Sequence, residues 1–301
     1  MSSVPREAQW TRRAERGSLP VVRLMAWLSL RLGRRATRWL LAPITAYFFA
    51  TSAKARAAVR TYLHRVLGRE PRMAEQFRLF SRFSSTIHDR IYFLKDRFDL
   101  FDIEMHGAEL FADDRGALLM GAHVGSFEAM RSCGRALSHR RVSMAMYEVN
   151  ARLLHQVLAA IEPRAVQDIV ALGRMDSMLA LGERLEAGHL VGVLADRSLG
   201  AEPTIDVPFL GAPAAFPTGP MRMAAALRQP VIFMVGLYRG GNRYEIHFER
   251  IADFSGAEEL RRGDRERRVR EAVERYAARL EHYCRVAPDN WFNFHDFWAR
   301  P

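Results

Sequence analysis

The apolar positions in the central part of the chain alternate between two patterns, that of a buried strand and that of an amphipathic helix. Four short apolar runs predict strands, and four segments of helical spacing predict helices. The strands are expected at 117–121, 142–147, 190–194 and 231–237, and the helices at 127–137, 151–161, 175–186 and 219–227. Weaker patterns predict a short strand at 102–105 and an edge strand at 244–251. Together they predict an α/β fold, a mixed central sheet with helices on both faces.

The flanking parts of the chain are expected to be helical. Helical spacing runs through 53–67 and 73–92, and again through a long charged segment, 258–283, whose apolar stripe we expect to face the core. The last segment, 288–301, is dense in aromatic residues. We expect it either to clasp the domain or to make a membrane contact.

The first 60 residues combine strong basic charge with large apolar side chains. They hold twelve Lys or Arg against two acids, and no apolar run reaches the roughly 20 residues that a membrane-spanning helix needs. One interpretation is a pair of amphipathic helices packed on the domain with a solvated basic face. The density of Trp, Phe and Leu favours another, in which residues 1–60 form basic amphipathic helices on an anionic membrane surface. Residues 61–301 would then form one α/β domain.

Composition narrows the class of protein. The formal net charge is +11, which is compatible with nucleic-acid binding, yet no helix-turn-helix, zinc-finger, RNP or KH pattern occurs, so no nucleic acid is expected. The two cysteines give neither a disulfide framework nor a metal pattern. We therefore expect no metal and no cofactor.

The segment HVGSFE, just after the strand at 117–121, holds the leading catalytic candidates. His123 falls in the break after the strand, Ser126 is a good N-cap, and Glu128 lies in the first turn of the next helix. The carboxylate could reach one ring nitrogen of the histidine and leave the other to take a proton from an alcohol or amine. Such an arrangement suits direct acyl transfer. The alternative is a capped helix beside a structural histidine.

Polar residues follow other predicted strands at the edge where α/β sheets place ligands. Asp196 and Arg197 follow the strand at 190–194, where Arg197 could clamp a phosphate or simply close a turn with Asp196. Asn150 and Arg152 follow the strand at 142–147 and are further candidates for substrate binding.

A Gly- and Pro-rich stretch before the helix at 219–227 reads as an irregular, stiff loop. It contains Gly211, and it ends in Thr218, a predicted N-cap, followed by Gly219. Backbone N–H groups at such a helix start can bind a phosphate or help to stabilise an oxyanion. These three residues complete the predicted substrate-binding set.

Four motifs in order carry a resemblance to a known family. HVGSFE, LADRSLG, VPFLGAPAAFPTGP and PDNWFNFHDFW resemble the bacterial late lipid A (lauroyl/myristoyl) acyltransferases over about residues 20–298. The arginine-broken N-terminal segment and the NFHDFW ending look more like the acyltransferases of aryl-polyene-type lipid pathways. Phosphatidylinositol-mannoside acyltransferases share the Ala-Asp-Arg element and remain possible.

The resemblance implies a glycerol-phosphate-acyltransferase-like fold and an activity. The enzyme would transfer a fatty acyl chain from an acyl carrier protein or coenzyme A thioester to a hydroxyl or amine of a lipid or glycolipid, at the cytoplasmic face of the inner membrane. The family's His-x4-acid motif falls on His123 and Glu128, its Asp-Arg element on Asp196 and Arg197, and its Phe-x-Gly loop on Phe209 and Gly211.

Overall fold

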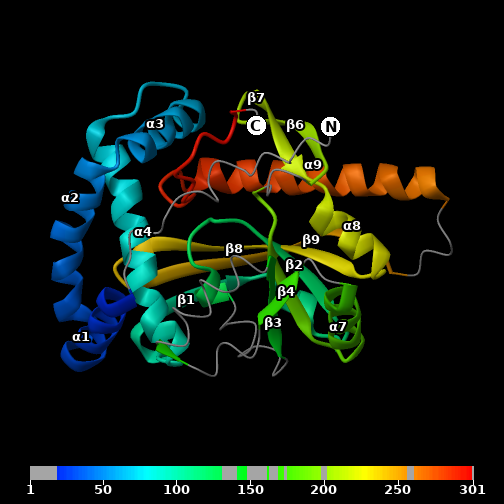
Figure 1. The fold of residues 1–301 in the computed structure, drawn as a ribbon, viewed down its shortest axis with the longest axis horizontal. Coiled ribbons are helices and arrows are strands. Elements are labelled where there is room, and N and C mark those ends of the chain that lie inside the picture. The colour runs from blue at the N-terminus through cyan, green and yellow to red at the C-terminus, as the bar shows by residue number, and fades with distance from the viewer. Residues whose placement is uncertain are drawn as a thin grey trace, which may run out of the picture.

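A seven-stranded mixed sheet forms the centre of the computed structural model, which describes residues 19–130, 141–147, 161–162, 169–172, 175–197, 202–255 and 261–299. The strand order within these residues is β1-β9-β8-β2-β5-β3-β4 (Figure 1). Neighbouring strands are parallel except for β8 and β9, which are antiparallel. The strands are β1 (Asp102–His106), β2 (Ala117–Gly121), β3 (Val142–Tyr147), β4 (Ile169–Leu172), β5 (Leu190–Leu194), β8 (Pro230–Gly240) and β9 (Arg243–Asp253).

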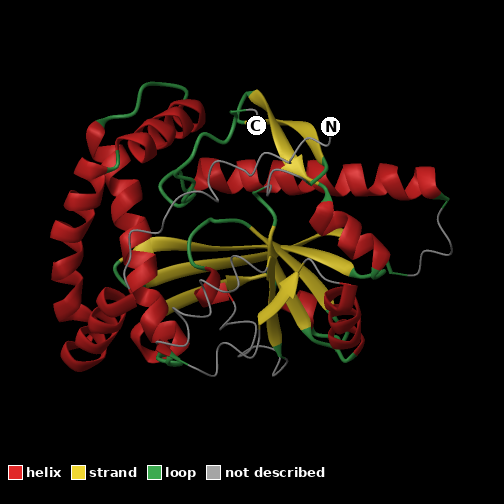
Figure 2. Ribbon diagram, viewed as in Figure 1, coloured by secondary structure: helices red, strands yellow, loops and turns green. Residues whose placement is uncertain are grey.

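Helices cover both faces of this sheet, as Figure 2 shows, and the expected α/β layering is confirmed. On one face Met120 and Phe233 share a core with Tyr276 of α9, the long helix that crosses the sheet. On the other, Leu119 shares a core with Phe93 of α4. The helices beyond the N-terminal group are α4 (Met73–Leu94), α7 (Met175–Glu186), α8 (Gly219–Ala226) and α9 (Arg262–Val286).

Several elements begin and end where the sequence predicts them, whereas β8, β9 and α9 end beyond their predicted bounds. β2, β3, β5 and α7 have the expected bounds. The helix after β2 is described only over 127–130, and the helix expected at 151–161 lies almost wholly outside the described residues.

The predicted edge position of β9 was wrong. β1 pairs with β9 in parallel, from Asp102 opposite Arg243 to His106 opposite His247, and so forms the edge itself. The alternating burial of β9 reflects one half-solvated face, which an inner strand can also have. The alternation of apolar and polar residues indicates which face of a strand is buried, but it does not indicate which strands are its neighbours in the sheet.

Four helical segments precede α4 and lie beside it (Figure 1). They are α1 (Leu19–Thr37), the 3-10 turn η1 (Arg38–Leu40), α2 (Leu41–Thr51) and α3 (Ala53–Leu67). Gly33 has a φ of 82° and kinks α1. α3 belongs to the main core, because Val59, Tyr62 and Leu63 are buried there. In the part of the chain that the structure describes, no helix is long and apolar enough to cross a membrane.

The proline-rich stretch expected as an irregular loop is an antiparallel hairpin. β6 (Thr204–Phe209) pairs with β7 (Ala212–Pro217), and the two residues between them, Leu210 and Gly211, have φ values of 49° and 79°. Positive φ at both central positions is the turn that hairpins favour. Prolines are tolerated here because each of the two strands leaves one edge unpaired.

Candidate active site

The turn between β2 and the following helix holds His123 at the end of a central strand. Gly125 has a φ of +63°, and a Cβ there would lie 1.8 Å from the carbonyl oxygen of Gly236 in β8, so only glycine fits. The backbone N–H of Ser126 donates to that same carbonyl at 2.8 Å. The Ser126 hydroxyl accepts a bond from the N–H of Ala129 at 3.2 Å, which confirms the predicted N-cap.

Asp196 is the hydrogen-bond partner of His123. β2 and β5 are parallel neighbours, and both chains leave the sheet at the same edge, with Gly121 opposite Leu194. Nδ1 of His123 lies 2.7 Å from Oδ1 of Asp196, and the backbone N–H of His123 donates to Oδ2 at 3.1 Å. Two residues 73 positions apart therefore form one unit.

The contacts of Asp196 fix the tautomer of the histidine. Trp291 donates its indole N–H to Oδ2 at 3.0 Å, and the whole residue Asp196 is only 1% exposed. Burial alone would raise the pKa of this carboxyl, but His123, the nearby charge of Arg197 and the Trp291 bond hold that pKa well below its usual range. An ionised carboxylate only accepts, so Nδ1 of His123 carries the proton and Nε2 keeps its lone pair.

The free face of the imidazole can reach a substrate. The His123 side chain is 31% exposed, and Nε2 makes no hydrogen bond to the described residues. Burial and then the charge of Arg197 lower the pKa of His123, against the opposing effect of Asp196. The ring is therefore neutral at pH 7 and able to accept a proton.

Glu128 has another partner than the one the sequence suggested. We expected its carboxylate to reach a ring nitrogen of His123, but Oε1 lies 2.6 Å from Nε of Arg90 in α4, and the expected contact is corrected accordingly. Glu128 is 4% exposed, so the ion pair is largely buried. Glu128 lies in the first turn of the helix after β2 and is directed towards α4. Asp196, just after β5, lies next to the imidazole ring of His123. The charge of Arg90, the partner of Glu128, is among the causes that lower the pKa of His123.

Arg197 brings a second positive charge to the site. Its guanidinium donates from Nη2 to the carbonyl of Phe292 at 3.0 Å, and Nε is buried with no hydrogen-bond partner in the described structure. Burial lowers the pKa of Arg197, and Asp196 opposes that effect. The site thus places a buried positive charge beside the neutral histidine.

A neutral histidine held by a buried carboxylate at the end of a parallel strand is compatible with several kinds of transfer chemistry, and the family to which the chain belongs distinguishes between them. The model of the bacterial lipid A biosynthesis acyltransferase family matches residues 9–300. The chain belongs to this family. It is therefore an acyltransferase of lipid biosynthesis.

Solved structures and curated proteins add little to this assignment. The acyltransferase resembles the 1-acyl-sn-glycerophosphate acyltransferase PlsC from Thermotoga maritima, with 19% identity, a TM-score of 0.40, and coverage of 82% of this chain and 97% of that one. The comparison with curated proteins gives no match.

Three of the predicted substrate-binding residues of the acyltransferase make no hydrogen bond to His123 in the described structure. Gly211 is at the exposed tip of the β6–β7 hairpin. Thr218 occupies the N-cap position of α8, as predicted, but its hydroxyl donates to the carbonyl of Pro203 at 3.0 Å and makes no cap bond. Gly219 begins α8 and makes no hydrogen bond to the histidine in the described structure. Asn150 and Arg152 lie outside the described residues.

The C-terminal segment contributes to the site in a way that the sequence did not reveal. The N–H of Phe292 donates to the carbonyl of His123 at 2.7 Å, and the carbonyl of Asn290 accepts from Gly125 at 2.8 Å. Trp291 is fully buried and packs edge-on against Phe209 of the hairpin, with ring centroids 5.5 Å apart. The aromatic tail is thus a clasp on the domain. Its density of aromatics was visible in the sequence, but its partner was not.

Proposed function

We propose that this acyltransferase moves a fatty acyl chain from a carrier-protein or coenzyme A thioester to a hydroxyl or amine of a lipid or glycolipid. His123 is the general base, and Asp196 orients it and stabilises the imidazolium that forms. The observation that carries the proposal is the 2.7 Å bond from Nδ1 to a buried carboxylate, with Nε2 on the partly exposed side.

The chemistry requires no protein nucleophile. Nε2 of His123 takes the proton from the acceptor hydroxyl or amine while the acceptor atom bonds to the thioester carbonyl carbon. The tetrahedral intermediate then expels the thiolate, which takes the proton from Nε2. The products are the acylated lipid and the free carrier thiol, and a positioned base of this kind contributes roughly a hundredfold or more to the rate.

Arg197 is suited to the negative charge that accompanies this reaction. Its charge acts on His123, and its buried Nε is without a partner among the described residues. We assign it to an anionic oxygen of the donor or acceptor. The net charge of +11 would favour an acidic carrier protein through electrostatic steering.

The N-terminal helices suit an anionic membrane surface, which we propose to be the cytoplasmic face of the inner membrane. Of the twelve large apolar side chains exposed in the described structure, eight lie between Leu24 and Phe48. The same stretch, residues 19–51, has five arginines and no acid. Apolar side chains beside a surplus of arginines are typical of helices lying in a membrane interface.

Thiol release from acyl carrier protein and coenzyme A thioesters, with and without a bacterial lipid extract, tests the catalytic proposal. We expect release that depends on lipid, and a labelled acyl chain on the lipid product names the acceptor class. His123→Ala should lower the rate by roughly a hundredfold or more.

His282→Ala is the matched control, because it removes an exposed histidine of α9. It should keep the wild-type rate. Wild-type activity in a folded His123→Ala protein would rule out His123 as the base.

A further inference from the structure

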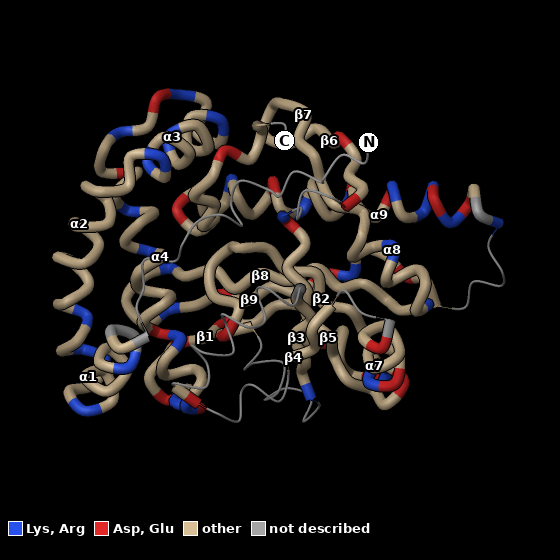
Figure 3. Tube along the Cα trace, viewed as in Figure 1, with Lys and Arg blue, Asp and Glu red and all other residues tan. Residues whose placement is uncertain are grey.

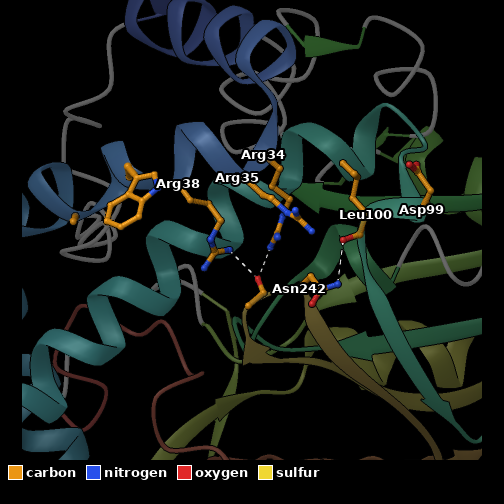
Figure 4. A pocket seen from close by; sticks show the side chains of 9 residues that line it. Arg34, Arg35, Arg38, Asp99, Leu100 and Asn242 are labelled. Atoms are coloured by element: carbon orange, nitrogen blue, oxygen red, sulfur yellow. Dashed lines mark hydrogen bonds between the residues drawn. The ribbon is translucent and has the colours of Figure 1, made fainter.

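A pocket of about 630 Å³ lies between the N-terminal helices and the turn that joins β8 to β9 (Figure 4). One wall carries three arginines of α1 and η1, Arg34, Arg35 and Arg38, together with Trp39. The opposite wall includes Asn242 of the turn. None of these residues contacts His123 or Asp196 in the described structure.

Two of the three arginines are fixed in place by the fold. Arg34 forms a bidentate pair with buried Asp89, at 2.7 and 2.8 Å, and donates to the carbonyl of Gly241 at 2.6 Å. Arg38 donates to the same carbonyl at 2.9 Å and to the hydroxyl of Tyr238 at 2.7 Å. These contacts hold both guanidiniums rigidly at the pocket wall.

The pocket keeps a surplus of positive charge. Asp89, which is buried outside the lining, pairs with Arg34, lies 3.9 Å from Arg38 and offsets one of the three charges. The acid of the lining, Asp99, is already paired with Arg97 at 2.9 and 3.1 Å. Arg35 is exposed, and among the described residues no acid lies within ion-pair distance of it. Arg35 is therefore available to an anion from outside.

The surroundings indicate what kind of anion this is. Trp39, in the wall itself, is 83% exposed, and Leu32 and Leu40 beside it are 59% and 39% exposed. Figure 3 shows basic residues of α1 on this side of the molecule. A phospholipid at the membrane surface combines an anionic phosphate with apolar acyl chains. Arginines beside an exposed tryptophan match both parts of such a molecule.

The pocket is separate from the acyl-transfer site. Gly236 of β8 binds the turn after His123, whereas the pocket includes Gly241, just past Gly240 at the end of the same strand. At about 3.3 Å per residue, the four-residue step from Gly236 to Gly240 spans roughly 13 Å. A lipid held in the pocket would thus leave the catalytic turn uncovered.

We propose that this pocket binds the phosphate of an anionic phospholipid headgroup and so holds the enzyme on the bilayer in one orientation. Arg35 and Arg38 contact the phosphate, and Trp39 lies among the acyl chains beside it. The inference rests on the proposed membrane contact of the N-terminal helices and is independent of the chemistry at His123.

Calorimetric titration with dihexanoyl phosphatidylglycerol, kept below its micelle concentration, tests the site. A single dissolved lipid has no collective surface potential, so diffuse attraction to a charged membrane does not contribute. We expect one saturable site, with dihexanoyl phosphatidylcholine and inorganic phosphate each binding at least about tenfold more weakly.

Two variants of equal charge separate the pocket from the general basic surface. Arg35→Gln should weaken the binding about tenfold, because one charge-assisted hydrogen bond is lost. Arg23→Gln, at an exposed position of α1 outside the pocket, should leave it unchanged. Unfolding curves that match wild type would show that both variants are folded.

Several outcomes would overturn the inference. Equal binding by Arg35→Gln and wild type would show that the pocket is not the site, and equal binding of inorganic phosphate would indicate a soluble anion. Arg35→Gln that raises only the KM for the carrier-protein thioester would assign the arginine to donor docking. His123→Ala should bind the lipid as wild type does, so failure of the catalytic proposal would leave this result intact.

Discussion

Two acidic residues are candidates for the hydrogen-bond partner of His123, and the structure shows which of them binds the ring. Glu128 is five residues away in the chain and pairs with Arg90, at 2.6 Å, while Asp196 is 73 residues away and accepts the Nδ1 proton. The sequence identified all three residues as site candidates but connected the wrong pair. A sequence motif shows which residues are close in the chain. A hydrogen bond between residues at the ends of two strands can be predicted only when the order of the strands in the sheet is known.

The assignment of Asp196 predicts a pH profile. Only neutral His123 accepts a proton, so the rate falls as the pH falls through the pKa of the ring, and that pKa lies below the ordinary value of 6.5. Asp196→Asn removes an interaction that raises this pKa, and the acid limb of kcat/KM should move to still lower pH. Loss of the correct tautomer should lower kcat by roughly four orders of magnitude.

Glu128→Gln is the control for that variant. It leaves the His123–Asp196 bond in place, so its rate loss should be smaller. Equal losses for the two variants, or an acid limb that does not move in Asp196→Asn, would contradict the assigned roles.

The turn between β2 and its helix is the element on which the site depends. It joins the end of β2 to β8 through Gly125 and Ser126, and to the C-terminal segment through Asn290 and Phe292. The sequence predicted the strand, the glycine turn and the N-cap, because each depends on residues that are adjacent in the chain. The close contact between β8 and Gly125 could not be predicted in the same way, because it depends on which strands pair in the sheet.

Gly125→Ala tests this close approach. The added Cβ would meet the Gly236 carbonyl at 1.8 Å, and the backbone has a φ of +63°, so the turn must shift and His123 with it. We expect a large loss of activity and a lower free energy of unfolding by at least about 2 kcal/mol, measured by denaturant titration.

Gly211→Ala is the matched control, with a φ of +79° and open space around the added Cβ. It should cost only the backbone strain, about 1 kcal/mol, and leave the rate near wild type. Similar losses of activity in both variants would mean that positive φ alone explains the effect.

At the scale of the whole molecule, a buried ion pair attaches the N-terminal helices to the domain. Arg34 of α1 binds Asp89 of α4, and Tyr244 of β9 donates to the same carboxylate at 2.8 Å. The side chains are 8% and 0% exposed. Burial alone would raise the pKa of Asp89, but the His88 imidazole, 3.6 Å away, and the hydrogen-bonded Arg34 guanidinium hold it below its ordinary value. The stability gained is therefore present at neutral pH and lost as the pH falls below about 3.8.

Asp89→Asn should lower the free energy of unfolding by about 3–5 kcal/mol, because it leaves the Arg34 guanidinium buried without its counter-charge. The double variant Arg34→Met, Asp89→Leu should recover part of that loss. Denaturant titration measures both. Arg60→Gln, which breaks an exposed pair with Glu70 whose side chains are 62% and 60% exposed, should cost less than about 1 kcal/mol. A cost for Asp89→Asn no larger than that would contradict the proposed attachment.

The sequence by itself determined the α/β layering, the bounds of strands such as Ala117–Gly121, the N-cap at Ser126 and the basic, apolar character of the N-terminal helices. These features follow from the spacing and chemistry of residues close together in the chain. Only the tertiary structure decided that β9 is an inner strand, that residues 204–217 form a hairpin, that Trp291 closes the site, and that Asp196 is the partner of His123. Each of these features depends on which distant segments pack together. The packing is the one that minimises the free energy of the whole chain, and a local sequence pattern does not contain that information.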